Sequence, residues 1–160
     1  MQGTLLTILL LILPILGVVL LRTNAAMMFF VLTGSVTLQS YLDQNVASFA
    51  SSLFGAGSTN SVSLVIIFLP LLVAVAAFRS TVAKKMLIPH VLLAVGVGMS
   101  IAFLVPQFFS ESLANSVRSS AIYDALQPYT SIVIAGSFLA SVVILWLNHP
   151  KHEHHKKHGH

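Results

Sequence analysis

The sequence predicts an all-α, polytopic integral membrane protein: a helical bundle of about five transmembrane helices with short amphipathic interfacial helices. Composition is the first observation behind this class, because 56% of the 160 residues are hydrophobic and only 8% are charged, whereas a soluble domain carries about a quarter charged residues. The second is a series of five apolar stretches, and the third is the sorting of basic residues into alternate connections. So few charges cannot cover a globular surface with well-hydrated groups, so we expect a lipid bilayer around the chain.

The five predicted spans belong to one transmembrane unit, residues 1–148, followed by a tail, residues 149–160. Each span is 17 or 18 residues long, close to the ~20 residues that cross a hydrocarbon core about 30 Å thick. A cleaved signal peptide would begin with a basic segment; the leader MQGT has none, so we expect the first span to be retained. The spans cover about residues 4–21, 25–42, 62–78, 89–106 and 130–147.

The second span is the most polar of the five. At 100° per residue, its small and polar side chains gather on one helix face: Thr33, Gly34, Thr37, Ser40 and Tyr41. We expect this face to point at other helices, because a hydroxyl that faces lipid lacks a strong partner. A water-lined path along the same face is the alternative.

The basic residues test the number of spans. With five spans, only Arg118 lies on one side of the membrane, and the other seven Lys and Arg residues share the opposite side. Lys and Arg are concentrated in cytoplasmic loops, so this split predicts an N-terminus outside and a C-terminus in the cytoplasm. The seven residues are Arg22, Arg79, Lys84, Lys85, Lys151, Lys156 and Lys157.

The first long outer segment, residues 43–61, predicts a short helix on the outer leaflet. Its apolar residues recur at three- and four-residue spacing, which is typical of an amphipathic interfacial helix. Asp43 is a candidate N-cap, and Gly55 and Gly57 are candidate stops.

The second outer segment, residues 107–129, is similar. Phe109, Leu113 and Val117 define an apolar side, and we expect a further helical turn over 120–126 before Pro128. Both outer helices are expected to pack over the bundle, and a docking site for an extracytoplasmic partner is the alternative.

Small residues at four-residue spacing predict close helix contacts in the last two spans. Ala94, Gly98 and Ala102 form one ladder, and Gly136 with Ala140 forms another. The spacing indicates that helices touch there, either within one chain or between copies.

No catalytic site and no nucleic-acid site is predicted. No span has a central Asp, Glu, Lys, Arg or His, which proton-relaying transporters normally have, and His90 is expected at the cytoplasmic interface. Glu111, Arg118 and Asp124 have no spacing typical of a nucleophile–base pair or a phosphate loop. Without cysteine, thiolate metal sites and disulfides are excluded.

The tail, residues 149–160, contains six histidines at spacings that suit Zn²⁺ or Ni²⁺ on a helix. Pro150 and Gly159 interrupt the segment, and nothing apolar would fold it. We therefore expect a flexible cationic tail whose lysines lean on anionic headgroups; weak metal binding and a specific partner are alternatives, and no other cofactor is expected. The candidate metal ligands are His149, His152, His154, His155, His158 and His160.

The order of features resembles a known family. A span ends at Arg22, a second ends in Tyr-Leu, and a surface helix, a span, a basic loop, a fourth span and the stretch SSAIYDALQPYTSIV follow. This resembles the CvpA family (colicin V production protein-like) of bacterial inner-membrane proteins, over about residues 5–134. The chain departs from the family at LLRTNA, in place of a basic Arg-Gly element, and in its His-rich tail. The resemblance implies an accessory role in envelope processes or secretion and carries over no functional residue.

Two functions follow from these features. The first is a non-enzymatic membrane scaffold or accessory factor that holds a membrane protein or a second copy of the chain. The second is an oligomeric channel or transport subunit with a polar path along the second span. The absence of charge within the spans favours the first.

Overall fold

The computed structural model describes residues 2–54, 59–83 and 86–147, and within these ranges all regular structure is helical. Five helices are long and apolar enough to cross a membrane, which confirms the predicted fold class. They are Gly3–Leu21, Ala25–Leu42, Asn60–Ala77, Leu87–Phe108 and Ala121–Leu147.

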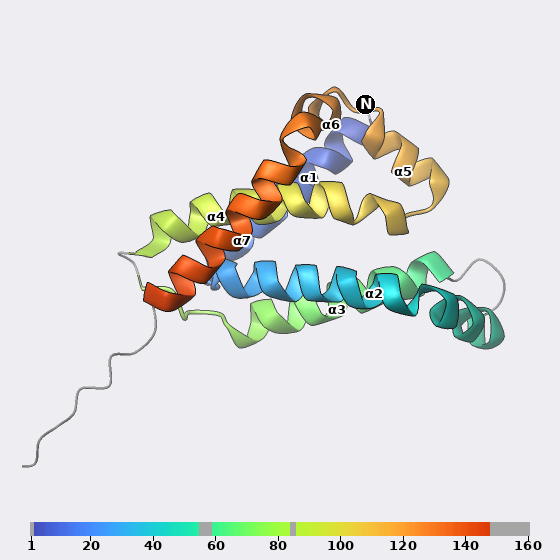
Figure 1. Cartoon of the computed structure of the whole chain (residues 1–160), viewed down its shortest axis with the longest axis horizontal. Helices are drawn as coiled ribbons and strands as arrows, with labels where there is room; N and C mark the ends of the chain where they lie inside the picture. The colour runs from blue at the N-terminus through green and yellow to red at the C-terminus, as the bar shows by residue number, and fades with distance from the viewer. Residues whose placement is uncertain (1, 55–58, 84–85, 148–160) are drawn as a thin grey trace, which may run out of the picture.

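Successive membrane-spanning helices alternate in direction (Figure 1). Helix α7 begins and ends where the sequence predicts the last span, and α1, α3 and α4 begin two or three residues before the predicted first, third and fourth spans. In order, the elements are α1 (Gln2–Leu21), α2 (Ala25–Phe54), α3 (Thr59–Ala77), α4 (Leu87–Leu104), η2 (Pro106–Phe108), α5 (Glu111–Arg118), α6 (Ala121–Leu126), η3 (Gln127–Tyr129) and α7 (Thr130–Leu147).

Two connections on the same end of the bundle are tied to each other. The backbone N–H of Ser80 donates to the carbonyl of Leu21 at 2.8 Å, and that of Val82 donates to the carbonyl of Arg22 at 3.1 Å. Arg22 and Arg79 therefore share one end, which we call the basic end, while α5 and its Arg118 lie at the other (Figure 1). Arg22 and Arg79 thus lie at one end of the bundle and Arg118 at the other, as a chain with five spans requires. Which end faces the cytoplasm stays a prediction.

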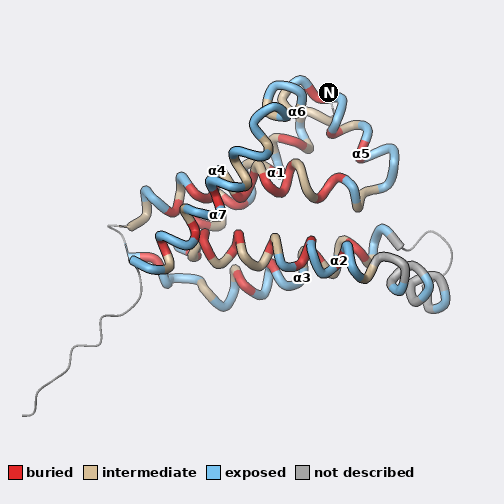
Figure 2. Tube along the Cα trace, in the orientation of Figure 1, coloured by how far each residue is buried: buried red, intermediate tan, exposed pale blue. Residues whose placement is uncertain are grey.

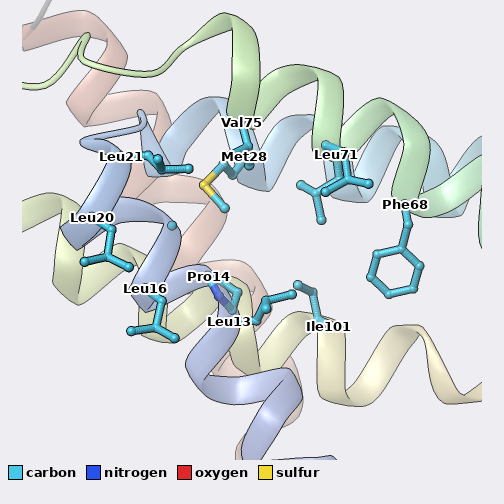
Figure 3. A pocket seen from close by; sticks show the side chains of 12 residues that line it. Leu13, Pro14, Leu16, Leu20, Leu21, Met28, Phe68, Leu71, Val75 and Ile101 are labelled. Carbon is cyan, nitrogen blue, oxygen red and sulfur yellow. The ribbon is translucent and has the colours of Figure 1, made fainter.

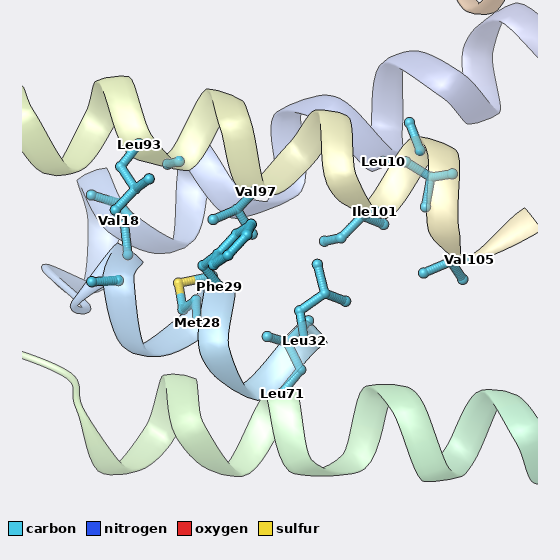
Figure 4. Close-up of a cluster of buried hydrophobic side chains, with 14 of the residues drawn as sticks. Leu10, Val18, Met28, Phe29, Leu32, Leu71, Leu93, Val97, Ile101 and Val105 are labelled. Carbon is cyan, nitrogen blue, oxygen red and sulfur yellow. The ribbon is translucent and has the colours of Figure 1, made fainter. Parts of the chain in front are cut away.

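The core is formed mainly by α1, α2 and α4, with side chains from α3 and α7 at its edge. Phe29 of α2 points towards Val97 of α4, and Leu32 lies beside Ile101 (Figure 4); all four are almost fully buried. Exposed positions lie along the outward sides of the helices (Figure 2). Many of them are leucine or isoleucine, for example Leu92 and Ile132. Lipid solvates such faces and water does not, so the pattern suits a bilayer.

The prediction of a separate surface helix beginning at Asp43 is wrong. Helix α2 runs without interruption from Ala25 to Phe54, so Asp43 lies inside a helix rather than at its N-cap. No Gly or Pro separates residue 42 from residue 54, so nothing in the backbone ends the helix at the membrane surface. The helix ends directly before Gly55; Gly55 and Gly57 lie outside the described residues.

The predicted apolar side of the second outer segment is confirmed at Val117, which is buried, and Phe109 packs against the core. It is wrong at Leu113, which is 49% exposed, because Ala114 is buried in its place. Helix α1 comes so close to α5 that a Cβ at Gly3 would collide with the Ser116 carbonyl. This contact sets which side of α5 is covered.

The short helix predicted over 120–126 is confirmed as α6, with Ser120 as its N-cap. The Ser120 hydroxyl accepts a hydrogen bond from the Tyr123 N–H at 3.2 Å. It thereby satisfies one of the free donors of the first helical turn.

Candidate functional site

The ladder of Ala94, Gly98 and Ala102 is a contact within the chain. Ala94 and Ala102 are almost fully buried, and a Cβ at Gly98 would collide with the carbonyl of Leu11 and lie 3.0 Å from its Cα. Helices α1 and α4 therefore approach backbone to backbone, as the four-residue spacing predicts.

In the second ladder, Ala140 packs against the core, whereas Gly136 makes no close contact with any residue that the structure describes. A Cβ at Gly136 would have no atom within 4 Å. Helix α7 instead meets α4 through Ser137, because a Cβ at Gly96 would collide with the Ser137 hydroxyl and lie 3.2 Å from its Cβ. Sequence reasoning missed Gly96, although it lies two residues from the ladder that it identified.

The polar face of α2 points away from the rest of the chain, contrary to the prediction. Thr37 and Ser40 are exposed, Tyr41 is 84% exposed, and a Cβ at Gly34 would have no atom within 4 Å. Only Thr33 is partly covered.

These hydroxyls can face outwards because their own helix supplies acceptors. Thr33 donates to the carbonyl of Phe29 at 2.9 Å, Thr37 to the carbonyl of Thr33 at 2.8 Å, and Ser40 to the carbonyl of Val36 at 3.0 Å. A bond to the residue four positions back removes most of the penalty of a hydroxyl in lipid.

A groove runs beside this polar face, between α2 and α7, with a cavity volume of about 700 Å³. Phe138, which lines the groove, packs edge to face against Phe30 of α2, with ring centroids 5.7 Å apart. We call this groove and the adjoining polar residues of α2 the α2–α7 face. It is formed by Phe29, Thr33, Gly34, Thr37, Ser131, Ile134, Ala135, Phe138 and Leu139.

His90 lies in the first turn of α4, at the basic end of the bundle, and it is buried against the start of α2. It is 1% exposed, and its Nδ1 accepts a hydrogen bond from the Ala25 N–H at 3.3 Å. The Asn24 side chain accepts from the Ala26 N–H at 3.0 Å, so the two residues together cap the start of α2. The His90 Nε2 has no partner among the described residues.

Two more buried polar pairs connect helices. The Gln39 amide donates to the Ser63 hydroxyl at 2.8 Å between α2 and α3, and the hydroxyls of Thr7 and Ser120 share a hydrogen bond of 3.0 Å. Each pair satisfies groups that would be costly to bury alone, although the Oε1 of Gln39 has no partner among the described residues.

In the described part of the chain, no group of three or more His, Cys, Asp or Glu could hold a metal ion. The predicted ligands all lie in the tail, outside the described residues, so weak Zn²⁺ or Ni²⁺ binding by the tail stays a prediction. They are His149, His152, His154, His155, His158 and His160.

No protein family, curated protein or solved structure matches the chain. The resemblance to the CvpA family therefore stays a prediction that rests on the order of features in the sequence. The α2–α7 face is the candidate functional site that the structure itself adds.

Proposed function

We propose that the protein is a non-enzymatic membrane scaffold that holds another membrane protein through the α2–α7 face. The observation that carries this proposal is the outward direction of Gly34, Thr37 and Ser40 on α2. Membrane helices associate through small residues and hydroxyls, since these let backbones come close.

The contrast with the other outward surfaces supports a protein partner over lipid alone. Exposed positions of α1, α4 and α7 are rich in leucine and isoleucine, such as Leu5, Leu92 and Ile132. The polar face of α2 instead leaves a shallow, small-residue surface next to the α2–α7 groove. A transmembrane helix of a partner fits this surface better than a flexible acyl chain does, because its side chains fill fixed gaps.

Site-specific photo-cross-linking in native membranes tests the proposal. A cross-linker at Thr37 is expected to capture a distinct membrane protein, while one at Leu92, on a leucine-rich face, is expected to capture none. Mild-detergent purification with mass spectrometry then identifies the captured chain. Equal capture at both positions, or none at Thr37, contradicts the scaffold.

The same face supports the second candidate function, an oligomeric channel or transport subunit. In a closed ring of copies, the outward hydroxyls of Thr33, Thr37 and Ser40 line a shared polar path. Cross-links from Thr37 to Thr37 of another copy, together with a closed homo-oligomer and solute flux in liposomes, favour the channel over the scaffold.

We also propose that the basic end faces the cytoplasm of a bacterial inner membrane, with the N-terminus outside. The Lys and Arg distribution supports this orientation, and the resemblance to the CvpA family supports an accessory role in envelope processes or secretion. Reporter fusions after Thr59 and Lys85 are expected to read outside and inside. An outside reading at Lys85 contradicts the orientation.

A further inference from the structure

The basic end holds two arginines that the scaffold proposal does not use. Arg22 and Arg79 line one small cavity together with Leu20, Leu21 and Ser80. Arg22 follows α1 and Arg79 follows α3, so the chain brings them together from positions 57 residues apart in the sequence.

The backbone holds this pair in a fixed arrangement. Arg22 has a φ of 50° and Ser80 a φ of 61°, a left-handed conformation that is unfavourable for residues with a side chain. The two hydrogen bonds between the connections, from Ser80 to Leu21 and from Val82 to Arg22, lock both turns. Unfavourable backbone conformations persist where the surroundings impose them, and they are enriched at ligand sites.

The two positive charges lack an acidic neighbour in the described part of the chain. Glu111 begins α5 and Asp124 lies in α6, both at the end of the bundle opposite the basic end (Figure 1). Asp43 is 18 residues along α2 from its start at that end, or about 27 Å at 1.5 Å per residue. Because no described carboxylate serves the pair, an anion from outside the described part of the chain is its natural partner.

An apolar groove leads away from the arginines into the membrane-spanning region. It lies between α1 and α3, with a cavity volume of about 310 Å³, and all of its lining residues are apolar. Leu16 and Leu20 of α1 form one side, Phe68 and Val75 of α3 form the other, and Met28 of α2 lies behind them (Figure 3).

The groove and the arginine cavity are adjacent, because Leu20 and Leu21 line both. A ligand that fills them has an apolar chain inside the membrane and an anionic group at its surface. A guanidinium group binds two phosphate oxygens at once through its planar fork of N–H donors. In the membrane, an acyl chain gains from the groove through close packing against its fixed side chains.

We propose that this is a specific site for one anionic phospholipid, with an acyl chain between α1 and α3 and the headgroup phosphate between Arg22 and Arg79. The site is independent of the α2–α7 face. A lipid held here joins α1 to α3 across the groove, so it stabilises the basic end of the bundle.

Native mass spectrometry of the detergent-solubilised protein tests the site. Titration with dioleoyl phosphatidylglycerol is expected to give one retained lipid, and dioleoyl phosphatidylcholine is expected to be retained far less. The double variant R22Q/R79Q is expected to weaken retention of phosphatidylglycerol by about tenfold, since two solvent-exposed ion contacts are lost. Arg118→Gln, which removes one arginine charge at the opposite end, is the control and is expected to retain the lipid.

A second pair of variants tests the groove without changing charge. Leu72→Trp fills the groove and is expected to weaken lipid retention, whereas Leu69→Trp, exposed on the same helix outside it, is expected to have no effect. Equal retention of the two lipids, or equal loss in R118Q and R22Q/R79Q, overturns the proposal. Displacement of the lipid by inorganic phosphate alone also overturns it, because the acyl chain then contributes nothing.

Discussion

The α1–α4 interface and the α2–α7 face contain the same kinds of residues and use them in opposite ways. At Gly98 a Cβ would collide with the backbone of α1, whereas at Gly34 it would meet no atom within 4 Å. Both lie in apolar helices, and both have small or hydroxyl residues nearby at helical spacing. The comparison teaches that small residues at helical spacing favour helix contact but do not specify the partner helix. At the α1–α4 interface the partner is another helix of the same chain, whereas at Gly34 no described helix comes close.

Gly98→Leu is expected to have the largest effect on stability, because the clash is with backbone and no side chain can turn away. The free energy of unfolding in detergent should fall by about 3 kcal/mol or more, at the upper end for overpacked sites. Thermal or denaturant unfolding of the purified protein measures it. Gly136→Leu, the same change at a position with open space, is the control and should unfold like the wild type. Equal losses in the two variants would show that the α1–α4 approach is looser than described.

His90→Leu tests whether the stability of the bundle also depends on the buried hydrogen bond between α4 and α2. The substitution removes the acceptor of the Ala25 N–H, and a buried donor without a partner costs about 1–3 kcal/mol. The free energy of unfolding should therefore fall by an amount near the lower end of this range, because the substitution also removes the unpaired Nε2.

His90→Gln supplies an acceptor of similar reach and should restore part of the stability in the same unfolding assay. If His90→Leu is more stable than the wild type, the unpaired nitrogen outweighs the cap. The role assigned to His90 in holding the start of α2 would then be wrong.

The positions of the spans could be predicted from the sequence, because each depends on the composition of a single stretch. For the stretch 130–147, the sequence predicts both the first and the last residue of helix α7 from the run of apolar residues. The direction of each helix face could not be predicted in the same way. The polar side of α2 was expected to turn inwards, and the bonds from Thr37 and Ser40 to their own helix remove the reason for that expectation.

The cap provided by His90 could not be found by local reasoning. Its partner, Ala25, is 65 residues away, and no spacing relates the two. Asn24, directly before α2, did carry a readable N-cap pattern, and its side chain accepts from the Ala26 N–H. The shared cavity of Arg22 and Arg79, two positions far apart in the sequence, likewise could be found only in the folded chain.

Thr7→Val extends the comparison to the outer helices. The change keeps the shape of the side chain and removes the hydrogen bond to the Ser120 hydroxyl that joins α1 to the start of α6. We expect a loss of about 1 kcal/mol in the unfolding assay. A double-mutant cycle with Ser120→Ala isolates the pair from the cap that Ser120 also provides. A coupling energy of zero would mean that the outer helices are held by α1–α5 packing alone.

Gly34→Leu is expected to have the smallest effect on stability and a large effect on binding. The added side chain meets no atom of the chain, and leucine favours a helix over glycine by up to about 1 kcal/mol, so unfolding should be unchanged or slightly delayed. The same side chain fills the shallow surface where we expect a partner helix to pack, so capture of the partner by a cross-linker at Thr37 should be lost. Leu38→Ile, also exposed on α2 but without a change in size, is the control and should leave capture intact. A stable Gly34→Leu variant that still captures the partner through Thr37 would show that the partner helix does not pack closely against Gly34, contrary to the proposed contact.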